Sequence, residues 1–358
     1  MTDTPGDLTR ELADLVGQIT PVDEAAGEAA RERHAGLAKP ARSLGRLETL
    51  GARLASVSGL CPPPVPSAPA LIVAAGDHGV HGEGVTPWPQ AITAIMTGVI
   101  ADGRAASSVM ADQLGVRVAV LDAGVLDDVA DRPALHRAGV LTGATANLRE
   151  ADAMTRDEAA ALVLAGAALA QQLLDDGADL LLTGDMGIAN TTASAALVAA
   201  FTGASADEVT GRGTGIDDAT LAVKAKVVDD ALRRTDPSSR DALGALAGLG
   251  GAEHAALVGV ILAGAAARVP VLLDGVIANA AALAAVALAP HTGGYLVAGH
   301  RSVEPGASRA LAHLRLDPLV DLDLRLGEGT GALLAVPIVQ CAARVLNDMA
   351  TLADLGIT

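Results

Sequence analysis

Across the middle of the chain, short apolar runs rich in Val, Leu and Ile alternate with longer alanine-rich stretches whose apolar residues recur at helical spacing. The short runs have the length and composition of buried strands, and the longer stretches have those of helices. This alternation predicts an α/β protein with a mostly parallel sheet and helices on both of its faces. The expected strands are Ala70–Ala75, Val116–Leu121, Leu180–Thr183, Val269–Leu273 and Tyr295–Ala298.

The helical stretches between these strands complete a doubly wound, Rossmann-like arrangement. Sheets of this kind bind ligands in the loops at the carboxyl ends of their strands, so those loops are where we expect a functional site. The expected helices in this part of the chain are Ala91–Leu114, Arg156–Asp176, Thr191–Ala200 and Asp217–Arg234.

Both ends of the chain are predicted to be helical and lie outside this alternation. Residues 8–38 and Leu44–Ser56 carry apolar residues at helical spacing, and Ala332–Leu355 does so again. Closely spaced prolines make residues 61–66 an extended linker. We therefore expect a small helical domain formed by the first segment and part of the last, beside an α/β domain; the boundaries are 1–62, 63–302 and 303–358.

Composition and charge exclude several kinds of partner. The chain has 358 residues, a net charge of −17 and only three aromatic residues, Trp88, Phe201 and Tyr295. Nucleic acids and anionic membrane surfaces attract a basic face, so we expect neither as a partner. With so few aromatic residues, the core must be built from Ala, Val, Leu and Ile.

Cysteine usage and the N-terminal sequence indicate a reducing compartment. The only cysteines, Cys61 and Cys341, are too few for a disulfide framework. The first residues are polar and acidic, unlike a signal peptide. The apolar run Leu272–Ala289 has about the length of a membrane span, but it contains Asp274 and Asn279 and begins as a buried strand. We therefore expect a soluble protein of the cytoplasm.

Glycine-rich polar clusters follow three of the expected strands, at residues 76–79, 184–187 and 299–302. Residues 184–192 offer backbone donors and two threonine hydroxyls that suit a phosphate or the hydroxyls of a ribose, although a strand-to-helix turn with a threonine cap explains them equally well. Ser302 offers a hydroxyl beside loop amides, which is a weak signal for an anion site.

Two further features of the loops concern metals and aromatic cover. Asp77, His78 and His81 could bind a metal, but two histidines three residues apart are too few without other ligands, so we expect a hydrogen-bond network and no metal. Trp88 is the only indole and stands between two prolines. It either covers a flat heterocycle or fills the core.

A fourth glycine-rich stretch, Gly211–Asp218, opens a helix that carries Lys224 two turns in. The free N–H groups of a helix start together with a lysine suit a phosphate. The stretch lacks the ending of a Walker A loop and the spacing of a dinucleotide-binding loop. By itself it favours an ordinary helix cap with acidic residues in the first turn.

Glu328 is the first candidate for a catalytic group. It stands between Gly327 and Gly329, where an apolar β-type run ends and a helical run begins. Flanking glycines let the backbone turn tightly and approach a ligand closely. The alternative is a carboxylate that only complements the dipole of the following helix.

Phosphate-suited loops, one indole that could cover a ring and one glycine-flanked carboxylate together suit a phosphoribosyl-type reaction. A set of motifs occurs in one order along the chain: Lys39-Pro40, Ser43-Leu44-Gly45, Ala75–Val80, Gly184–Thr192, Gly211–Asp218, Pro270–Gly275, Gly299–Gly306 and Leu326–Ala332. Through these motifs, over about residues 37–357, the chain resembles the nicotinate-nucleotide–dimethylbenzimidazole phosphoribosyltransferases, which prepare the lower ligand of cobalamin.

The resemblance implies roles for individual residues. Glu328 would be the general base, and Gly187, Lys224 and Ser302 would hold the phosphate of nicotinate mononucleotide. The chain departs from the usual family pattern at Asp185, where a glutamate is usual, at Ala189, where a glycine is usual, and at Thr86, where a serine is usual, so the preferred base stays open. The acceptor pocket and the other implied substrate contacts come from Thr86, Trp88, Gln90, Asp185, Met186, Ile188, Leu326 and Gly327.

The implied reaction transfers the phosphoribosyl group of nicotinate mononucleotide to 5,6-dimethylbenzimidazole, which gives α-ribazole 5′-phosphate and nicotinate. The resemblance also implies a homodimer that uses no cofactor. A pyridinium leaving group needs no acid and an attacking azole needs one base, which fits a single carboxylate. The alternatives are transfer to a purine or phenol, and a non-catalytic nucleotide-binding module. A dehydrogenase is disfavoured because the dinucleotide-binding motif is missing.

Overall fold

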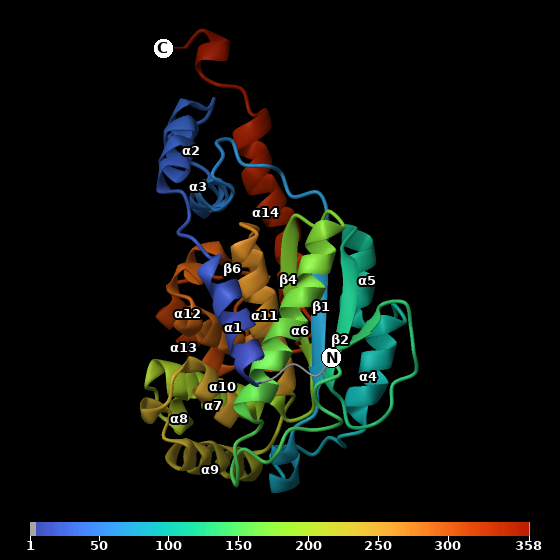
Figure 1. Cartoon of the computed structure of the whole chain (residues 1–358). Helices are drawn as coiled ribbons and strands as arrows, with labels where there is room; N and C mark the ends of the chain where they lie inside the picture. The colour runs from blue at the N-terminus through green and yellow to red at the C-terminus, as the bar shows by residue number, and fades with distance from the viewer. Residues whose placement is uncertain (1–4, 358) are drawn as a thin grey trace.

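The structure is a computed structural model that describes residues 5–357. Its centre is a six-stranded sheet with the strand order β3-β2-β1-β4-β5-β6, flanked by helices (Figure 1). All pairs of neighbouring strands are parallel, which confirms the predicted doubly wound sheet. The strands are β1 (Pro69–Gly76), β2 (Arg117–Gly124), β3 (Leu135–Arg137), β4 (Leu180–Met186), β5 (Val271–Leu273) and β6 (Leu296–Ala298).

Helices make up most of the remaining described chain. The α-helices are α1 (Pro5–Gly17), α2 (Glu24–Gly36), α3 (Arg46–Ser58), α4 (Ile92–Ala101), α5 (Ala106–Leu114), α6 (Arg156–Asp175), α7 (Asn190–Thr202), α8 (Ala206–Val209), α9 (Asp218–Thr235), α10 (Ala242–Leu249), α11 (Ala252–Ala266), α12 (Val276–Leu288), α13 (Pro305–Leu314) and α14 (Thr330–Asp348). Short 3₁₀ helices are η1 (Gly79–Glu83), η2 (Pro237–Ser239), η3 (Pro290–Tyr295) and η4 (Ala353–Leu355).

All five predicted strands are present, and some details of the prediction are wrong, among them the end of the last helix, which is Asp348 and not Leu355. The short edge strand β3 was not expected. The single helix predicted over Ala91–Leu114 is two helices, α4 and α5. The break follows Asp102, where Gly103 takes a positive φ of 76° that a continuing helix does not allow.

The strand order reverses between β1 and β4. From β1 the chain builds the sheet outward through β2 and β3, and from β4 it builds the other side through β5 and β6. The loops that leave the carboxyl ends of β1 and β4 therefore diverge, which opens the crevice where doubly wound sheets bind ligands. The sheet thus places the loops after Gly76 and Met186 beside each other.

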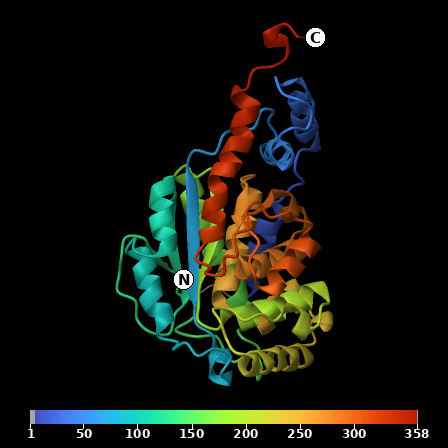
Figure 2. The same ribbon diagram turned by 180° about the vertical axis from the view of Figure 1, so that it is seen from behind.

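Both faces of the sheet are covered. Helices α6, α11 and α12 pack on one face and α4, α5 and α14 on the other, as the view from behind also shows (Figure 2). In β1, Ile72 joins the core under α11 while its neighbours Leu71 and Val73 join the core under α14. Burial on both faces explains why the strands are almost continuously apolar in sequence.

Glycines let two helices cross at very short distance on the first face. A Cβ atom at Gly166 of α6 would lie 1.9 Å from the carbonyl oxygen of Ala256, and one at Gly259 of α11 would lie 1.8 Å from that of Val163. Neither position can carry a side chain without moving a helix. The small residues of this alanine-rich chain thus replace aromatic bulk with close helix packing.

Part of the helical ends forms the small helical group that was predicted. Helices α2 and α3 pack against each other and against α14 at the end of the molecule away from α9 (Figure 1). Helix α1 instead lies against α6 and α11, over the sheet. The fold class is confirmed, while the division into domains at residues 62 and 302 stays a prediction.

Two apolar segments have the length of a membrane span. The run Leu272–Ala289 divides at Asp274 into β5 and α12, so it is not one helix. Among residues 5–357, α14 is the helix that is long and apolar enough to cross a membrane, but 56% of its apolar window is buried inside the fold. A core helix of a folded domain has this property.

Candidate active site

A cavity of ≈ 100 Å³ lies at the carboxyl ends of the strands β4, β5 and β6. Its walls include Thr191 at the start of α7, Gly213 before α9, and Glu304 before α13. Segments far apart in the chain therefore meet where the sheet topology requires it. The predicted site residues that line this cavity are Asp185, Met186, Gly187, Ile188, Ser302, Leu326 and Gly327.

Glu328 follows directly on this wall, on a turn with unusual backbone geometry. Gly327, Glu328 and Gly329 have φ values of 83°, 60° and 85°, so three consecutive residues are left-handed. For a residue with a Cβ this conformation costs roughly 1–2 kcal/mol. A Cβ atom at Gly184 of β4 would lie 2.8 Å from the backbone of Glu328, so the turn rests directly on the strand.

The carboxylate of Glu328 is buried but not isolated. The residue is 4% exposed, and the hydroxyl of Ser107 at the start of α5 donates a hydrogen bond of 3.0 Å to its Oε2. Burial raises the pKa of Glu328, and the charge of Asp274 adds to this, while the bond from Ser107 opposes it. A carboxyl with a raised pKa is better suited to accept a proton from a substrate near neutral pH.

Asp185 at the end of β4 is a second buried carboxyl. Its Oδ2 accepts a hydrogen bond of 3.0 Å from the side-chain amide of Asn190, and its Oδ1 has no hydrogen-bond partner among the described residues. Burial raises the pKa of Asp185 well above the usual value, and the charges of Asp274 and Glu253 raise it further. Asp185 is therefore more easily protonated than an ordinary aspartate.

Lys224 approaches the same cavity from behind its wall. The residue is 2% exposed, and its Nζ donates hydrogen bonds of 2.8 Å to the hydroxyl of Thr191 and 2.9 Å to the carbonyl of Gly211. Burial lowers the pKa of Lys224 to about 8, although Glu304 opposes the shift. A buried ammonium beside loop amides is suited to bind an anion.

Glu304 holds the glycine-rich loop against this lysine. Its Oε1 accepts a hydrogen bond of 2.7 Å from the backbone N–H of Gly213, and a Cβ atom at Gly211 would lie 2.2 Å from its Oε2. The hydroxyl of Ser302 accepts a bond of 3.4 Å from the N–H of Glu304. Lys224 and Glu304 thus link three segments to one another: the start of α7 at Thr191, the loop at 211–213 and the loop at 302–304.

Thr86, Trp88 and Gln90 do not line this cavity and lie on the loop between η1 and α4. Trp88 is 47% exposed, so the alternative that it fills the core is wrong. The backbone N–H of Trp88 donates to Thr86 Oγ1 at 3.3 Å, and Gln90 Nε2 donates to the carbonyl of His78 at 3.3 Å. In α4, the Thr93 hydroxyl accepts a bond of 3.1 Å from the N–H of Ile188, which ties this side to the cavity.

The polar residues after β1 are divided between two networks. His78 Nε2 lies 2.9 Å from Glu253 Oε1, and His254 Nδ1 lies 2.7 Å from the same oxygen. Within residues 5–357 this buried trio is the group whose potential metal-binding atoms lie within 4.8 Å of one another. His78 and Glu253 are hydrogen-bonded, whereas His254 Nδ1 lies at ion-pair distance and forms no hydrogen bond with the described residues. His81 instead lies 2.9 Å from the carbonyl of Trp88.

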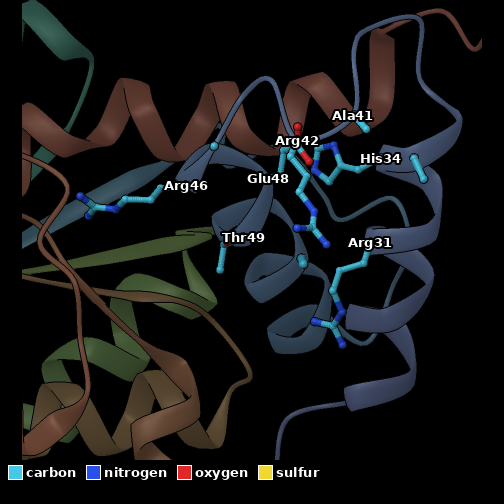
Figure 3. Close-up of a pocket in the computed structure, with 10 residues that line it drawn as sticks. Arg31, His34, Ala41, Arg42, Arg46, Glu48 and Thr49 are labelled. Carbon is cyan, nitrogen blue, oxygen red and sulfur yellow. The ribbon is translucent and has the colours of Figure 1, made fainter.

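A larger cavity of ≈ 680 Å³ lies between α2 and α3, at the other end of the molecule (Figure 3). His34, Arg42 and Glu48 come together there, whereas Arg46 points away from them. None of the predicted site residues lines this cavity. Helix α14, which packs against α2 and α3, is roughly 28 Å long at the usual helical rise and begins at the turn that carries Glu328.

Several residues of the site were not predicted. Asp274 and Glu304 belong to motifs that were recognised, and their position directly after a strand or before a helix was the available signal. Ser107 and Asn190 contact the two site carboxylates from ordinary helix starts. Asn190 lies in the recognised Gly184–Thr192 motif, whereas Ser107 has no signal in the sequence that distinguishes it from a helix cap.

Comparisons with known proteins agree with this geometry. A family model described as a phosphoribosyltransferase matches residues 19–357. A Salinispora tropica protein named nicotinate-nucleotide–dimethylbenzimidazole phosphoribosyltransferase is 53% identical over 353 residues, which cover 95% of this chain and 97% of that protein. The chain belongs to the nicotinate-nucleotide–dimethylbenzimidazole phosphoribosyltransferase family.

Other members of the family match over similar lengths. The Chloroflexus aurantiacus protein of the same name is 49% identical, with 96% of this chain and 97% of that protein covered. The crystal structure of CobT from Thermus thermophilus superposes with a TM-score of 0.90 at 44% identity, covering 93% of this chain and 99% of that one. The predicted family, fold and transferase class are thereby confirmed, whereas the roles of single site residues stay predictions.

Proposed function

We propose that the protein transfers the phosphoribosyl group of nicotinate mononucleotide to 5,6-dimethylbenzimidazole, giving α-ribazole 5′-phosphate and nicotinate for the lower ligand of cobalamin. The observation that carries this proposal is the left-handed turn that places a buried carboxylate, Glu328, next to a cavity backed by the buried ammonium of Lys224. The names of relatives that cover almost the whole chain support the choice of substrates.

The chemistry needs one base. The bond between C1′ of the ribose and the pyridinium nitrogen breaks, and its electron pair returns to that nitrogen, which leaves as neutral pyridine. A nitrogen of the azole forms the new bond to C1′ from the opposite face, and its N–H proton passes to the carboxylate of Glu328. Atoms and charge balance without another reactant, and the negative carboxylate favours the positive charge that develops on the ribose.

The two substrates would lie on either side of Glu328. Lys224, Ser302 and the amides at Gly187 would hold the phosphate in the cavity, because they surround its wall with donors. The acceptor would lie on the side of α4 and α5, where Ser107 contacts the carboxylate. The exposed indole of Trp88 would cover the acceptor ring from this side.

Asp185 would have a role beside these residues. Its raised pKa and its unpartnered oxygen suit a hydrogen bond with a substrate hydroxyl or ring nitrogen. The remaining substrate contacts would come from Gln90, Met186, Ile188, Leu326 and Gly327. A homodimer in the cytoplasm that needs no cofactor completes the proposal.

The test is a reaction of the purified protein with both substrates, followed by chromatography and NMR of the product. We expect nicotinate and α-ribazole 5′-phosphate in equal amounts, with the α configuration at C1′. Adenine and phenol serve as competing acceptors in the same assay. Binding of both substrates without nicotinate release, or a clear preference for a competing acceptor, would contradict the proposal.

A further inference from the structure

Asp274 binds the backbone on the far side of the Glu328 turn. It follows directly on β5 and is 0% exposed. Its Oδ2 accepts a hydrogen bond of 3.0 Å from the N–H of Gly329. Its Oδ1 accepts bonds of 2.8 Å from the N–H of Gly331 and 3.3 Å from that of Ala332.

These bonds replace a cap that α14 cannot make itself. The N-cap of α14 is Gly329, which has no side chain to accept a hydrogen bond from the first turn. The first N–H groups of a helix need a partner from elsewhere when the helix start is buried. Asp274 provides that partner from a neighbouring strand and so attaches the start of α14 to the sheet.

Asp274 is itself held from both sides. Its backbone N–H donates to the hydroxyl of Thr183 in β4 at 3.2 Å, and that hydroxyl donates to the carbonyl of Leu272 at 3.2 Å. The ring of His300, after β6, brings Nε2 to 3.4 Å from Oδ1 of Asp274. The carboxylate therefore has a defined place relative to three strands.

The turn at Glu328 has further hydrogen bonds of its own, since the N–H and the hydroxyl of Thr330 donate to the carbonyl of Gly327 at 3.1 and 2.9 Å. The N–H of Glu328 donates to the carbonyl of Asp185 at 3.2 Å. Glycine on either side leaves the turn many alternative conformations, and a left-handed glutamate is not the preferred one. Without the bonds to Asp274, the N–H groups of Gly329 and Gly331 would lose their partner, and the carboxylate of Glu328 would be held by Ser107 and the remaining bonds of the turn alone.

We propose that Asp274 is a positioning residue of the reaction, which caps α14 and thereby holds the Gly327–Gly329 turn in the conformation that presents Glu328 to the substrates. This inference rests on the proposed function, because a general base must point its carboxylate at the proton that it accepts. Asp274 acts through the backbone and need not touch a substrate.

The charge of Asp274 adds a property that a simple cap would not have. It is one of the groups that raise the pKa of Glu328. The other polar and titratable groups around this carboxylate are Ser107 from α5 and Asp185 from β4, and His300 faces Asp274 from the loop after β6. A neutral residue of the same size at 274 separates the effect of charge from that of shape.

The test compares Asp274→Asn with the unchanged protein in steady-state kinetics, with nicotinate mononucleotide and 5,6-dimethylbenzimidazole as substrates. Asparagine keeps one acceptor oxygen and loses the charge. We expect kcat to fall by on the order of 10²-fold, as for a misplaced catalytic group, with little change in KM for the nucleotide. The acid limb of the pH profile of kcat moves to lower pH, because Glu328 then loses its proton more easily.

Asp23→Asn is the matched control. Asp23 caps α2 by accepting a bond of 3.0 Å from the N–H of Ala26, far from the turn in sequence, so this variant should leave both kcat and the acid limb unchanged.

Amide exchange followed by mass spectrometry gives a readout that needs no turnover. Peptides over residues 326–333 should exchange faster in Asp274→Asn while the rest of the sheet is unchanged. If this variant does not fold, Thr183→Val, which removes the hydroxyl that holds Asp274, should show the same changes in weaker form. A kcat within twofold of the unchanged protein, an unmoved acid limb, or unchanged exchange at 326–333 overturns the proposal. Absence of turnover in the unchanged protein would instead refute the proposed function, and the exchange experiment would still decide the role of Asp274 in holding the turn.

Discussion

Glu328 combines an unfavourable backbone conformation with an unfavourable environment for its charge. Its φ is 60°, and burial raises its pKa above the usual value. Neither property stabilises the fold, and both are typical of residues retained for function. This combination separates Glu328 from a carboxylate that only complements a helix dipole, because a dipole partner would have a lowered pKa.

The first residue-scale prediction concerns Glu328→Gln. We expect kcat to fall by about 10²–10⁴-fold, because a general base is lost, while both substrates still bind. Because the pKa of Glu328 is raised on folding, the folded state binds more protons and the carboxylate lowers stability as pH rises through and above its ordinary range. The free energy of unfolding in urea at pH 7 should therefore be equal to or higher than that of the unchanged protein. A near-native kcat would remove Glu328 from the mechanism.

The second residue-scale prediction concerns Lys224. Its pKa of about 8 means that the ammonium begins to lose its proton just above neutral pH. A bound phosphate stabilises the charged form, so affinity for nicotinate mononucleotide should begin to fall just above neutral pH and fall steeply above pH 8. Isothermal titration across this range, from neutral to alkaline pH, measures the effect. Lys224→Gln should bind nicotinate mononucleotide more weakly, by about 1.5–3 kcal/mol, and its affinity should not depend on pH in this range. If the affinity of the variant falls with pH in the same way, the pH dependence belongs to another group.

At the scale of elements, one close helix crossing in the core depends on glycine rather than on large side chains. Gly166 and Gly259 bring α6 and α11 together over the sheet, each against a carbonyl of the other helix. A carbonyl is part of the backbone and cannot change rotamer to make room. Packing by close approach therefore tolerates even less change than packing by interlocking side chains.

The element-scale prediction is that Gly259→Ala destabilises the protein by about 1–3 kcal/mol, as overpacked cores do. Gly36→Ala at the end of α2 is the control, because a Cβ there has no atom within 4 Å. The control should change stability by less than about 1 kcal/mol, in the direction of helix propensity. Urea unfolding of the two variants compares them directly. Equal stability of both variants would mean that α6 and α11 adjust freely.

At the scale of the molecule, one end of the sheet carries the candidate active site and the other carries the helical group. Helix α14 joins the two, since it begins at the Glu328 turn and packs at its other end on α2 and α3. Its start is fixed by Asp274.

The prediction at this scale concerns assembly. We expect a homodimer at micromolar concentration by sedimentation velocity in about 0.15 M salt, where charge repulsion is screened over about 8 Å. Each chain carries a net charge of −17, so two copies repel each other. The dimer should therefore dissociate more readily as salt is lowered. A monomer at every salt concentration would contradict the expectation.

The sequence alone determined the α/β alternation and drew attention to Glu328. Both depend on local patterns: strands buried on two faces are continuously apolar, and a carboxylate between glycines is visible without knowing its neighbours. The five strands were predictable for this reason. The recognised motifs also indicated the residues that line the cavity, because each motif directly follows a strand or opens a helix.

Only the tertiary structure decided what holds these groups in place. Asp274 lies 55 residues from Gly329 and Ser107 lies 221 residues from Glu328, so no local pattern relates them. The same holds for the packing of α1 on α6 rather than on α2, and for the raised pKa of Asp185. Burial and hydrogen bonding between distant segments depend on which strands become neighbours, and hydrophobic periodicity does not encode that order.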